Sequence, residues 1–584
     1  MRIPAIRLPE LTERRKLLLL SFVVGILAGL ASVLLWYLID LVKSLLNGDF
    51  ARSSYNWQYL AYPGIGMFLT LLLLKFVVKD NIGHGVTKVL LAVSRNESRI
   101  RPHNMWSSVL TSSITIGFGG SVGAEAPIVY TGAAIGSNIG RWCKLSYKNI
   151  TTLLGCGAAA AVAGIFKAPL AGVLFTLEIL LFNVSMSSLF PLLISTISAT
   201  VVAYLFRGQT PTFACSLTPF NMANLPFYGI LGVVGGFASL YFTGMTLFLE
   251  DRLAKFRNRY LVWLLSALAL GLLIFLFPPL YGEGYDSLEL LLQGKDIQVE
   301  GRSVFSFMAD SPWSVPLFFA LIFLAKVFAM TLTNSGGGVG GTFGPTLFSG
   351  AIMGFFIARS MNLLGAGVPE QNFVLVGMAA LMAGVMQAPM TAIFLIAEIS
   401  GGYDLLIPLI LTSTITFGTV RIFEKYSIYT KRIAQSGDLL THDSDQAVLT
   451  LMKTSDLIRD KYPRINPDTT LGGMVDVISD TTAAVMAVID DEGHFQGLID
   501  IGNVRKYIFN TKDYDKLHVY NLMEDAPATV RSDEKMDSVM SKFDKTEAWR
   551  LPVLDGDGKY LGFISRSRIL TAYREELKLI SQED

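Results

Sequence analysis

Long apolar runs separated by short polar segments fill the chain from Lys16 to about Arg421. A helix of about 20 apolar residues crosses the hydrocarbon core of a bilayer. The pattern therefore predicts a membrane domain made of many helices. The spanning runs are 17–46, 57–78, 189–206, 227–249, 261–280 and 313–332, and further apolar runs reach residue 420.

Other apolar pieces are too short to span or are interrupted. Val89–Val93 and Ser107–Phe118 are half-length pieces, and the run from Ile150 to Phe182 is broken at Lys167-Ala168-Pro169. Half-length helices with glycine or proline interruptions mark the binding sites of channels and transporters. We therefore expect broken helices that meet inside the membrane.

The stretch Gly120-Ser121-Val122-Gly123-Ala124-Glu125-Ala126-Pro127 places a carboxylate between two apolar runs. An ionisable group at that depth is costly and usually faces a cavity or a conduction path. Pro127 suits the first turn of a helix. Glu125 is therefore predicted at the positive end of a broken helix, where amide N–H groups attract either a small anion or the glutamate carboxylate itself.

Two halves of the apolar region repeat each other. Residues 157–179 match residues 377–399, about 220 positions later, and Gly120–Pro127 matches Gly338–Pro345. Self-similarity at a fixed large offset predicts a duplicated membrane fold, with repeats near 16–206 and 226–422. Glu178 and Glu398 are equivalent in the two repeats, which favours helix capping over proton transfer as their role.

The chain after residue 436 is polar and charged. Residues 436–450 form a linker, and two β-α-β-β-α patterns follow at 451–511 and 518–578. Each pattern contains a hairpin signal, in which Asp491-Glu492-Gly493 or Asp555–Gly558 turns between two apolar strands. This part is predicted to be a soluble α/β tail.

Composition and charge exclude several classes of protein. The formal net charge of +1 over 584 residues implies no nucleic-acid partner. The three cysteines have spacing that suits neither a disulfide framework nor a zinc site. Among the spans no nucleophile–base pair or metal cluster appears, so we expect no enzyme activity. Arg14-Arg15-Lys16 precedes the first span and predicts that residues 1–15 are cytoplasmic.

Three motifs resemble those of CLC chloride channels and proton-coupled chloride antiporters. Gly123–Pro127 is similar to the family's G-R/K-E-G-P, Gly341–Pro345 to its G-x-F-x-P, and Ser427-Ile428-Tyr429 to the segment with the pore tyrosine. The tail resembles a CBS-domain pair. The resemblance implies an all-α polytopic domain over 16–435, with inverted repeats and broken helices, followed by CBS domains. It also implies a homodimer in the lipid bilayer with one pore per subunit.

The resemblance assigns roles to individual residues. It implies that Glu125 is the gating and proton-carrying glutamate. It implies chloride contacts from five residues: His84, Gly85, Thr342, Phe343 and Tyr429. His84 stands where the family has a serine, and Ile179 stands where antiporters have an internal proton-transfer glutamate, with Glu178 just before it. The possible proton path at Glu178 and Ile179 therefore stays open, and so does a passive channel.

CBS pairs often bind adenine nucleotides, and the resemblance gives candidate contacts at Asp500, Ser565, Arg566 and Arg568. Neither repeat carries the aspartate that binds the ribose in that signature. This departure favours a structural or dimerising role for the tail, because fold-level analogy alone does not fix a ligand. No cofactor is expected to be required for transport.

The leading hypothesis is therefore chloride/proton antiport in a bacterial inner membrane, with the CBS domains in the cytoplasm. The two glycine-rich motifs contain no lysine or arginine. Helix N-termini can attract an anion without trapping it, as permeation requires. The alternatives are a chloride channel, a fluoride exporter of the same fold and, remotely, a nucleotide sensor with a membrane anchor.

Overall fold

A computed structural model describes the chain as two compact units, residues 1–440 and 441–584. The described residues are 12–47, 58–80, 82–83, 85–95, 98–180, 186–213, 217–296, 311–435 and 452–582. His84 and the predicted linker at 436–450 lie outside them.

The first unit is built from helices, as the apolar runs predict. Eight of the described helices are long and apolar enough to cross a membrane, by length and composition. The helices are α1 Glu13–Asn47, α2 Gln58–Leu73, α3 Gly85–Arg95, α4 Ser107–Gly117, α5 Glu125–Trp142, α6 Tyr147–Phe166, α7 Pro169–Glu178, α8 Met186–Arg207, α9 Leu225–Ala254, α10 Arg259–Leu276, α11 Tyr285–Leu292, α13 Ser314–Ser335, α14 Phe343–Leu363, α15 Glu370–Met386, α16 Pro389–Ser400, α17 Leu406–Phe423 and α18 Ile428–Gln435.

The predicted breaks occur at equivalent places in the two repeats. Between α6 and α7, Lys167 adopts a left-handed conformation with φ of 58°, and Gln387 does the same between α15 and α16 with φ of 52°. Pro169 and Pro389 then begin the next helix, where a missing N–H costs nothing. A left-handed residue followed by a helix-starting proline thus turns the chain in both halves.

Glycine pairs bring equivalent helices into close contact. A Cβ on Gly132 of α5 would lie 2.1 Å from the carbonyl oxygen of Gly157 on α6. In the second repeat, a Cβ on Gly350 of α14 would lie 2.4 Å from the carbonyl oxygen of Gly377 on α15. Small residues permit such close backbone approach between membrane helices. The broken helices α5 and α14 are therefore held inside the protein.

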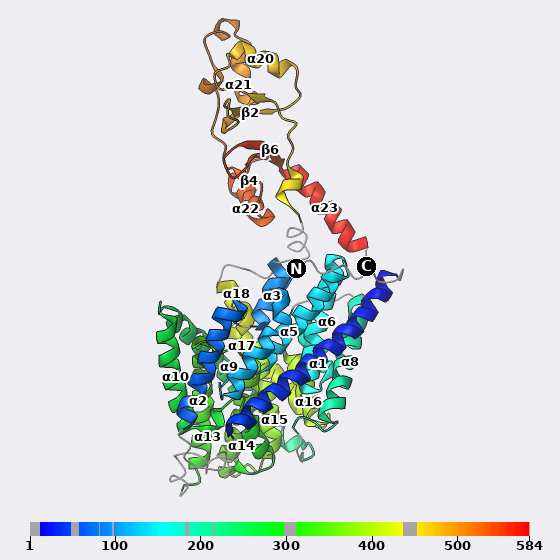
Figure 1. The fold of residues 1–584 in the computed structure, drawn as a ribbon, viewed down its shortest axis with the longest axis vertical. Helices are drawn as coiled ribbons and strands as arrows, with labels where there is room; N and C mark the ends of the chain where they lie inside the picture. Colours follow the sequence, from blue (N-terminus) through cyan, green and yellow to red (C-terminus); the bar gives the residue numbers. More distant parts are fainter. Residues whose placement is uncertain are drawn as a thin grey trace. The chain divides into compact units, whose positions relative to one another are not determined.

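The long first helix covers this interior. α1 runs obliquely across α5, α6 and α8, which it contacts (Figure 1). One side of α1 is buried, at Val24, Ala28 and Leu35, while Phe22, Leu34 and Leu41 remain exposed. An exposed apolar face of this kind suits a lipid environment. The helices α5, α14 and α15, by contrast, are almost wholly buried.

The second unit contains two copies of one pattern. The first has β1 Arg464–Ile465, α20 Leu471–Ser479, β2 Val485–Ile489, β3 Phe495–Asp500 and α21 Ile501–Ile508. The second has β4 Val530–Arg531, α22 Met536–Thr546, β5 Arg550–Leu554, β6 Tyr560–Ser565 and α23 Arg566–Gln582. In each sheet the first strand pairs parallel with the second, and the second pairs antiparallel with the third. The predicted β-α-β-β-α order is present in both copies.

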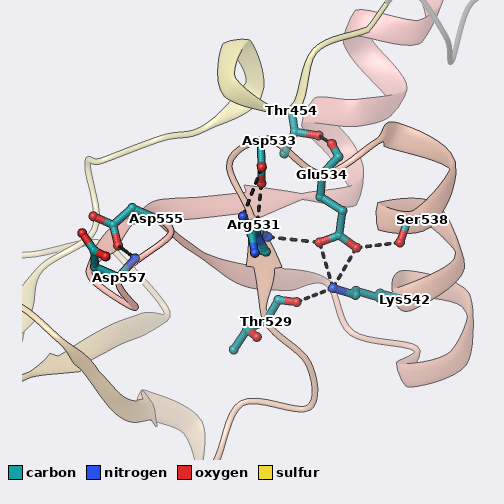
Figure 2. A network of polar contacts seen from close by, with 9 residues as sticks. All are labelled: Thr454, Thr529, Arg531, Asp533, Glu534, Ser538, Lys542, Asp555 and Asp557. Atoms are coloured by element: carbon teal, nitrogen blue, oxygen red, sulfur yellow. Dashed lines mark hydrogen bonds and ion pairs between the residues drawn. The ribbon is translucent and has the colours of Figure 1, made fainter. Parts of the chain in front are cut away.

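A polar network fixes the turn between β4 and α22 (Figure 2). Glu534 accepts hydrogen bonds from Lys542 at 2.8 Å, Ser538 at 2.6 Å and the backbone N–H of Arg531 at 3.0 Å. Lys542 also donates to the carbonyl of Thr529. Burial alone would raise the pKa of Glu534, but the bonds from Lys542 and Ser538 outweigh it and leave that pKa below its usual value.

Candidate functional site

The two glycine-rich motifs meet inside the first unit. Gly123 and Gly341 form an antiparallel backbone bridge, with N···O distances of 3.1 and 2.7 Å. The helices α5 and α14 begin just after this bridge, at Glu125 and Phe343. Their N-termini, which carry unpaired amide groups and the positive ends of the helix dipoles, therefore lie side by side.

The side chain of Glu125 lies at the N-terminus of α14. Its Oε2 accepts a hydrogen bond of 3.1 Å from the backbone N–H of Gly344. Its Oε1 accepts one of 2.5 Å from the hydroxyl of Tyr285. The residue is only 2% exposed. We call the position occupied by this carboxylate, beside the Gly344 amide and the Tyr285 hydroxyl, the anion seat.

A further helix N-terminus, that of α3, lies against the first turn of α5. Gly85 begins α3, and a Cβ there would lie 2.4 Å from the carbonyl oxygen of Ala126, so α3 starts against the first turn of α5. Tyr429 lies in the first turn of α18, which contacts α3. The Tyr429 hydroxyl is buried and has no hydrogen-bond partner in the described part of the chain.

The ring of Phe343 closes one side of this region. It lies 5.6 Å from the ring of Phe166, at the end of α6, and 6.2 Å from that of Phe175 on α7. Of the predicted chloride contacts, the structure thus gathers Gly85, Phe343 and Tyr429, with Thr342 directly before α14. His84 lies outside the described residues, so its predicted contact stays a prediction.

Charged groups that the motif analysis missed lie beside the anion seat. Lys326 of α13 is fully buried, and its Nζ donates to Ser121 Oγ at 2.9 Å and to the carbonyls of Gly282 and Glu283 at 3.2 and 3.4 Å. Glu283 Oε1 accepts a 3.2 Å bond from the N–H of Ala124. Neither glycine-rich motif contains a basic residue, but the buried Lys326 lies beside the first of them.

Of the residues Lys326, Glu283 and Tyr285, only Lys326 carried a signal in the sequence. Lys326 interrupts an apolar span, and an ionisable residue in a membrane helix is by default a functional candidate. Tyr285 and Glu283 fall in the polar segment that follows the span 261–280 and carry no such signal. Their importance comes from the folded chain, which returns this segment to the Glu125 motif.

Glu178 and Glu398 each cap a helix that belongs to the other repeat. Glu178 accepts bonds from the N–H groups of Met390 and Thr391 at 3.0 and 2.6 Å, at the start of α16. Glu398 accepts bonds from the N–H groups of Leu170 and Ala171 at 3.0 and 2.9 Å, at the start of α7. This reciprocal arrangement is a capping geometry, as expected from their duplication. Ile179, 4% exposed, follows Glu178 at the end of α7.

Three of the four nucleotide candidates in the tail, Asp500, Ser565 and Arg566, have side-chain partners within the protein. Asp500 caps α21 by accepting from the N–H of Gly502 at 2.8 Å. Arg566 donates to the carbonyl of Phe543 at 2.7 Å and to Asp544 at 3.1 Å. Ser565 bonds to the hydroxyl of Ser567 and accepts from the backbone N–H of Arg568. These four residues belong to two repeats, with Asp500 in the first and the other three in the second.

Comparison with known families identifies the fold. The profile described as "Voltage gated chloride channel" matches residues 65–421, which is more than half of the chain. The chain belongs to the CLC family. The profile of the CBS domain matches residues 519–575, within the second repeat of the tail. The resemblance stated from the three motifs is confirmed, and so is a polytopic all-α CLC membrane domain with a CBS tail.

Individual relatives of this CLC protein carry names of both kinds, chloride channel and exchanger. It is 28% identical to a "Putative chloride channel protein ClcB-like" of Ralstonia nicotianae, over 66% of this chain and 88% of the relative. It is 28% identical to the "H(+)/Cl(-) exchange transporter ClcA" of Salmonella paratyphi B, over 68% of this chain and 83% of the relative.

A crystal structure of a eukaryotic CLC transporter shares the fold. Its TM-score is 0.60 at 19% identity, covering 95% of this chain and 98% of that one. This match extends over the tail as well as the membrane helices. The CLC protein described here is an integral membrane protein.

Proposed function

We propose that this CLC protein exchanges chloride for protons across the membrane, with Glu125 as both gate and proton carrier. The observation that carries the proposal is the position of the Glu125 carboxylate at the N-terminus of α14, where it accepts the Gly344 amide. A carboxylate and a halide compete for the same donors. The curated relative from Salmonella is named as a H⁺/Cl⁻ exchanger, which supports the same reaction.

The exchange follows from this competition. Ionised Glu125 occupies the anion seat and excludes chloride. When Glu125 takes up a proton, it loses the charge that holds it at the α14 N-terminus, and chloride enters the seat instead. Release of chloride lets the carboxylate return and give up its proton. Movement of the Glu125 side chain thus couples the uptake and release of a proton to the entry and release of chloride.

The other donors fit a weakly held anion. The buried hydroxyl of Tyr429 and the N-termini of α3 and α14 offer partial positive charge from several directions. Multi-site, partial-charge binding is strong enough for entry and weak enough for release. We propose chloride contacts from Gly85, Thr342, Phe343 and Tyr429, and from His84, which precedes Gly85 in the sequence.

The buried amine of Lys326 requires a separate explanation. Its Nζ donates to Ser121 and to two backbone carbonyls, so its hydrogen-bonding capacity is used within the protein. We propose that it fastens the loop before α11 to the Glu125 motif without holding chloride directly. In this role Lys326 stabilises the Glu125 motif and does not bind the anion.

The remaining assignments concern the whole protein. We propose a homodimer in a bacterial inner membrane, with the N-terminal segment and the CBS domains in the cytoplasm. We propose a structural role for the CBS pair without bound nucleotide, because Asp500 and Arg566 are engaged within their own repeats. Calorimetric titration with ATP, ADP and AMP should give no heat, and binding of any of them would contradict this role.

A passive chloride channel is the second candidate. Ile179 favours it, because an isoleucine stands where the resemblance places the internal proton-transfer glutamate. The channel name of the Ralstonia relative points the same way. The capping geometry of Glu178 also leaves that side chain committed to the start of α16 rather than free to carry protons.

A liposome experiment separates the two candidates. Purified protein in vesicles with a chloride gradient and no initial pH gradient should move protons and so generate a pH difference across the membrane, as seen with a pH dye. The control is Glu125→Gln, which should carry chloride without moving protons. Chloride flux without any proton movement in the native protein would decide for the channel.

A further inference from the structure

We propose that Tyr285 is a positioning residue that holds Glu125 in the anion seat and so sets how readily chloride displaces it. The inference rests on the proposed function, since it assumes that chloride and Glu125 compete. It adds a residue from outside the pore motifs, on the short helix α11. Tyr285 acts through Glu125 rather than by touching the transported chloride.

The contact between the two side chains is short and enclosed. The Tyr285 hydroxyl donates to Glu125 Oε1 at 2.5 Å, while Gly344 holds Oε2 at 3.1 Å. Both carboxylate oxygens are therefore bound, each by a donor from a different helix. Hydrogen bonds to an ionised acceptor are about twice as strong as neutral ones. The Tyr285 bond thus favours the ionised, seated form of Glu125.

The loop that carries Tyr285 is fastened to the Glu125 motif itself. Ser121 Oγ donates to the carbonyl of Leu280 at 2.7 Å, and the N–H of Gly282 donates to the carbonyl of Gly119 at 3.1 Å. Glu283 accepts from the N–H of Ala124. The motif and the loop therefore move together, and the first residue of α11 is fixed beside Glu125.

Two more contacts orient the ring and the helix. The ring of Phe213 meets that of Tyr285 edge-on, with centroids 5.3 Å apart. Gly284, at φ of 88°, turns the chain into α11, and a Cβ there would lie 2.6 Å from the ring of Phe348. These contacts are independent of the tyrosine hydroxyl. Replacing Tyr285 by phenylalanine should therefore remove the donor and keep the packing.

The test is chloride titration of the full-length protein in detergent by isothermal calorimetry. Tyr285→Phe weakens the binding of the Glu125 carboxylate in the anion seat, where it competes with chloride. The apparent Kd for chloride should therefore fall roughly tenfold, in line with the loss of one hydrogen bond to a charged group. Tyr281→Phe is the matched control. Tyr281 lies in the same loop, and its hydroxyl donates to the carbonyl of Gly117 at 3.4 Å. The chloride Kd of the Tyr281→Phe protein should therefore stay within twofold of the native value.

A double-mutant cycle shows whether the effect passes through the carboxylate. In a Glu125→Ala background, Tyr285→Phe should leave the chloride Kd unchanged within twofold. A tenfold change of the chloride Kd in both backgrounds would mean that Tyr285 contacts chloride directly. An unchanged Kd in the native background would mean that Tyr285 does not hold Glu125 in the anion seat. Either result overturns the proposal.

A second variant covers the case in which Tyr285→Phe does not fold. Incorporation of 3-fluorotyrosine at position 285 gives a stronger hydroxyl donor of nearly the same size, so the chloride Kd should rise; an unchanged or lower Kd contradicts the proposal. The proposed function has its own readout, proton movement in liposomes. Intact proton coupling with no effect of position 285 would overturn the role of Tyr285 alone. If the chloride Kd shifts as predicted but chloride flux moves no protons in liposomes, the proposed exchange alone would be overturned.

Discussion

Replacement of Glu125 by glutamine tests the competition in the anion seat most simply. Both carboxylate oxygens accept hydrogen bonds, from Tyr285 and Gly344. The glutamine amide has one acceptor oxygen, so its NH₂ group must face one of these two donors. Loss of one bond to a charged group costs about 1.5–3 kcal/mol, and making the other bond neutral costs about 1 kcal/mol more.

The expected weakening of the seated side chain is therefore about 2.5–4 kcal/mol. Since 1.4 kcal/mol is a factor of ten, chloride should bind roughly 60- to 700-fold more tightly to the Glu125→Gln protein. Calorimetric titration with chloride measures this directly. The magnitude assumes that the native carboxylate occupies the seat most of the time at the pH of the measurement.

Glu398→Gln is the control for removing a buried acid from the same unit. Glu398 caps α7 and takes no part in the anion seat, so chloride affinity should stay within twofold of the native value. An unchanged chloride Kd in Glu125→Gln would refute the competition. A similar gain in both variants would trace the effect to overall charge instead.

The reciprocal caps and the tail network give further predictions. Glu178→Ala leaves two N–H groups at the start of α16 without their partner, so the melting temperature of the purified protein should fall by an amount matching about 1–2 kcal/mol, while the proton-to-chloride ratio in liposomes stays native. Loss of coupling without loss of stability would instead favour a proton-path role. In the tail, the pKa of Glu534 is lowered by its partners despite burial, so its stabilising effect is complete above the usual glutamate pKa of about 4.3 and disappears as the pH falls through the lower, folded value. Glu534→Gln should therefore lower the melting temperature of the tail at pH 7, and the difference should vanish in strong acid; a constant difference at all pH values would contradict this.

Much of the membrane fold could be predicted because its signals are local. The broken helices follow from proline and glycine at fixed positions, and the break at Lys167-Ala168-Pro169 lies where the pattern places it. The Glu125 motif begins a helix, as its glycines and Pro127 indicate. The hairpins of the tail follow from their Asp-Gly turns, and α21 begins directly after β3, at Ile501, because Asp500 caps it.

The rest depends on contacts between distant parts of the chain. The bond from Tyr285 to Glu125 joins residues 160 positions apart, and that from Lys326 to Ser121 joins residues 205 apart. No periodicity or motif in one sequence encodes such pairs. The capping role of Glu178 and Glu398 was accessible only because duplication made them equivalent. Which helix each one caps became visible only in the folded protein.

The central claim is that one acid and one halide alternate in the seat, and a reversal potential measures it most directly. The protein should be placed in a planar bilayer with opposing chloride and pH gradients. Exchange predicts a reversal potential that lies away from the chloride equilibrium value and moves when only the pH gradient is changed. A reversal potential that stays at the chloride equilibrium value, whatever the pH on either side, would contradict the account.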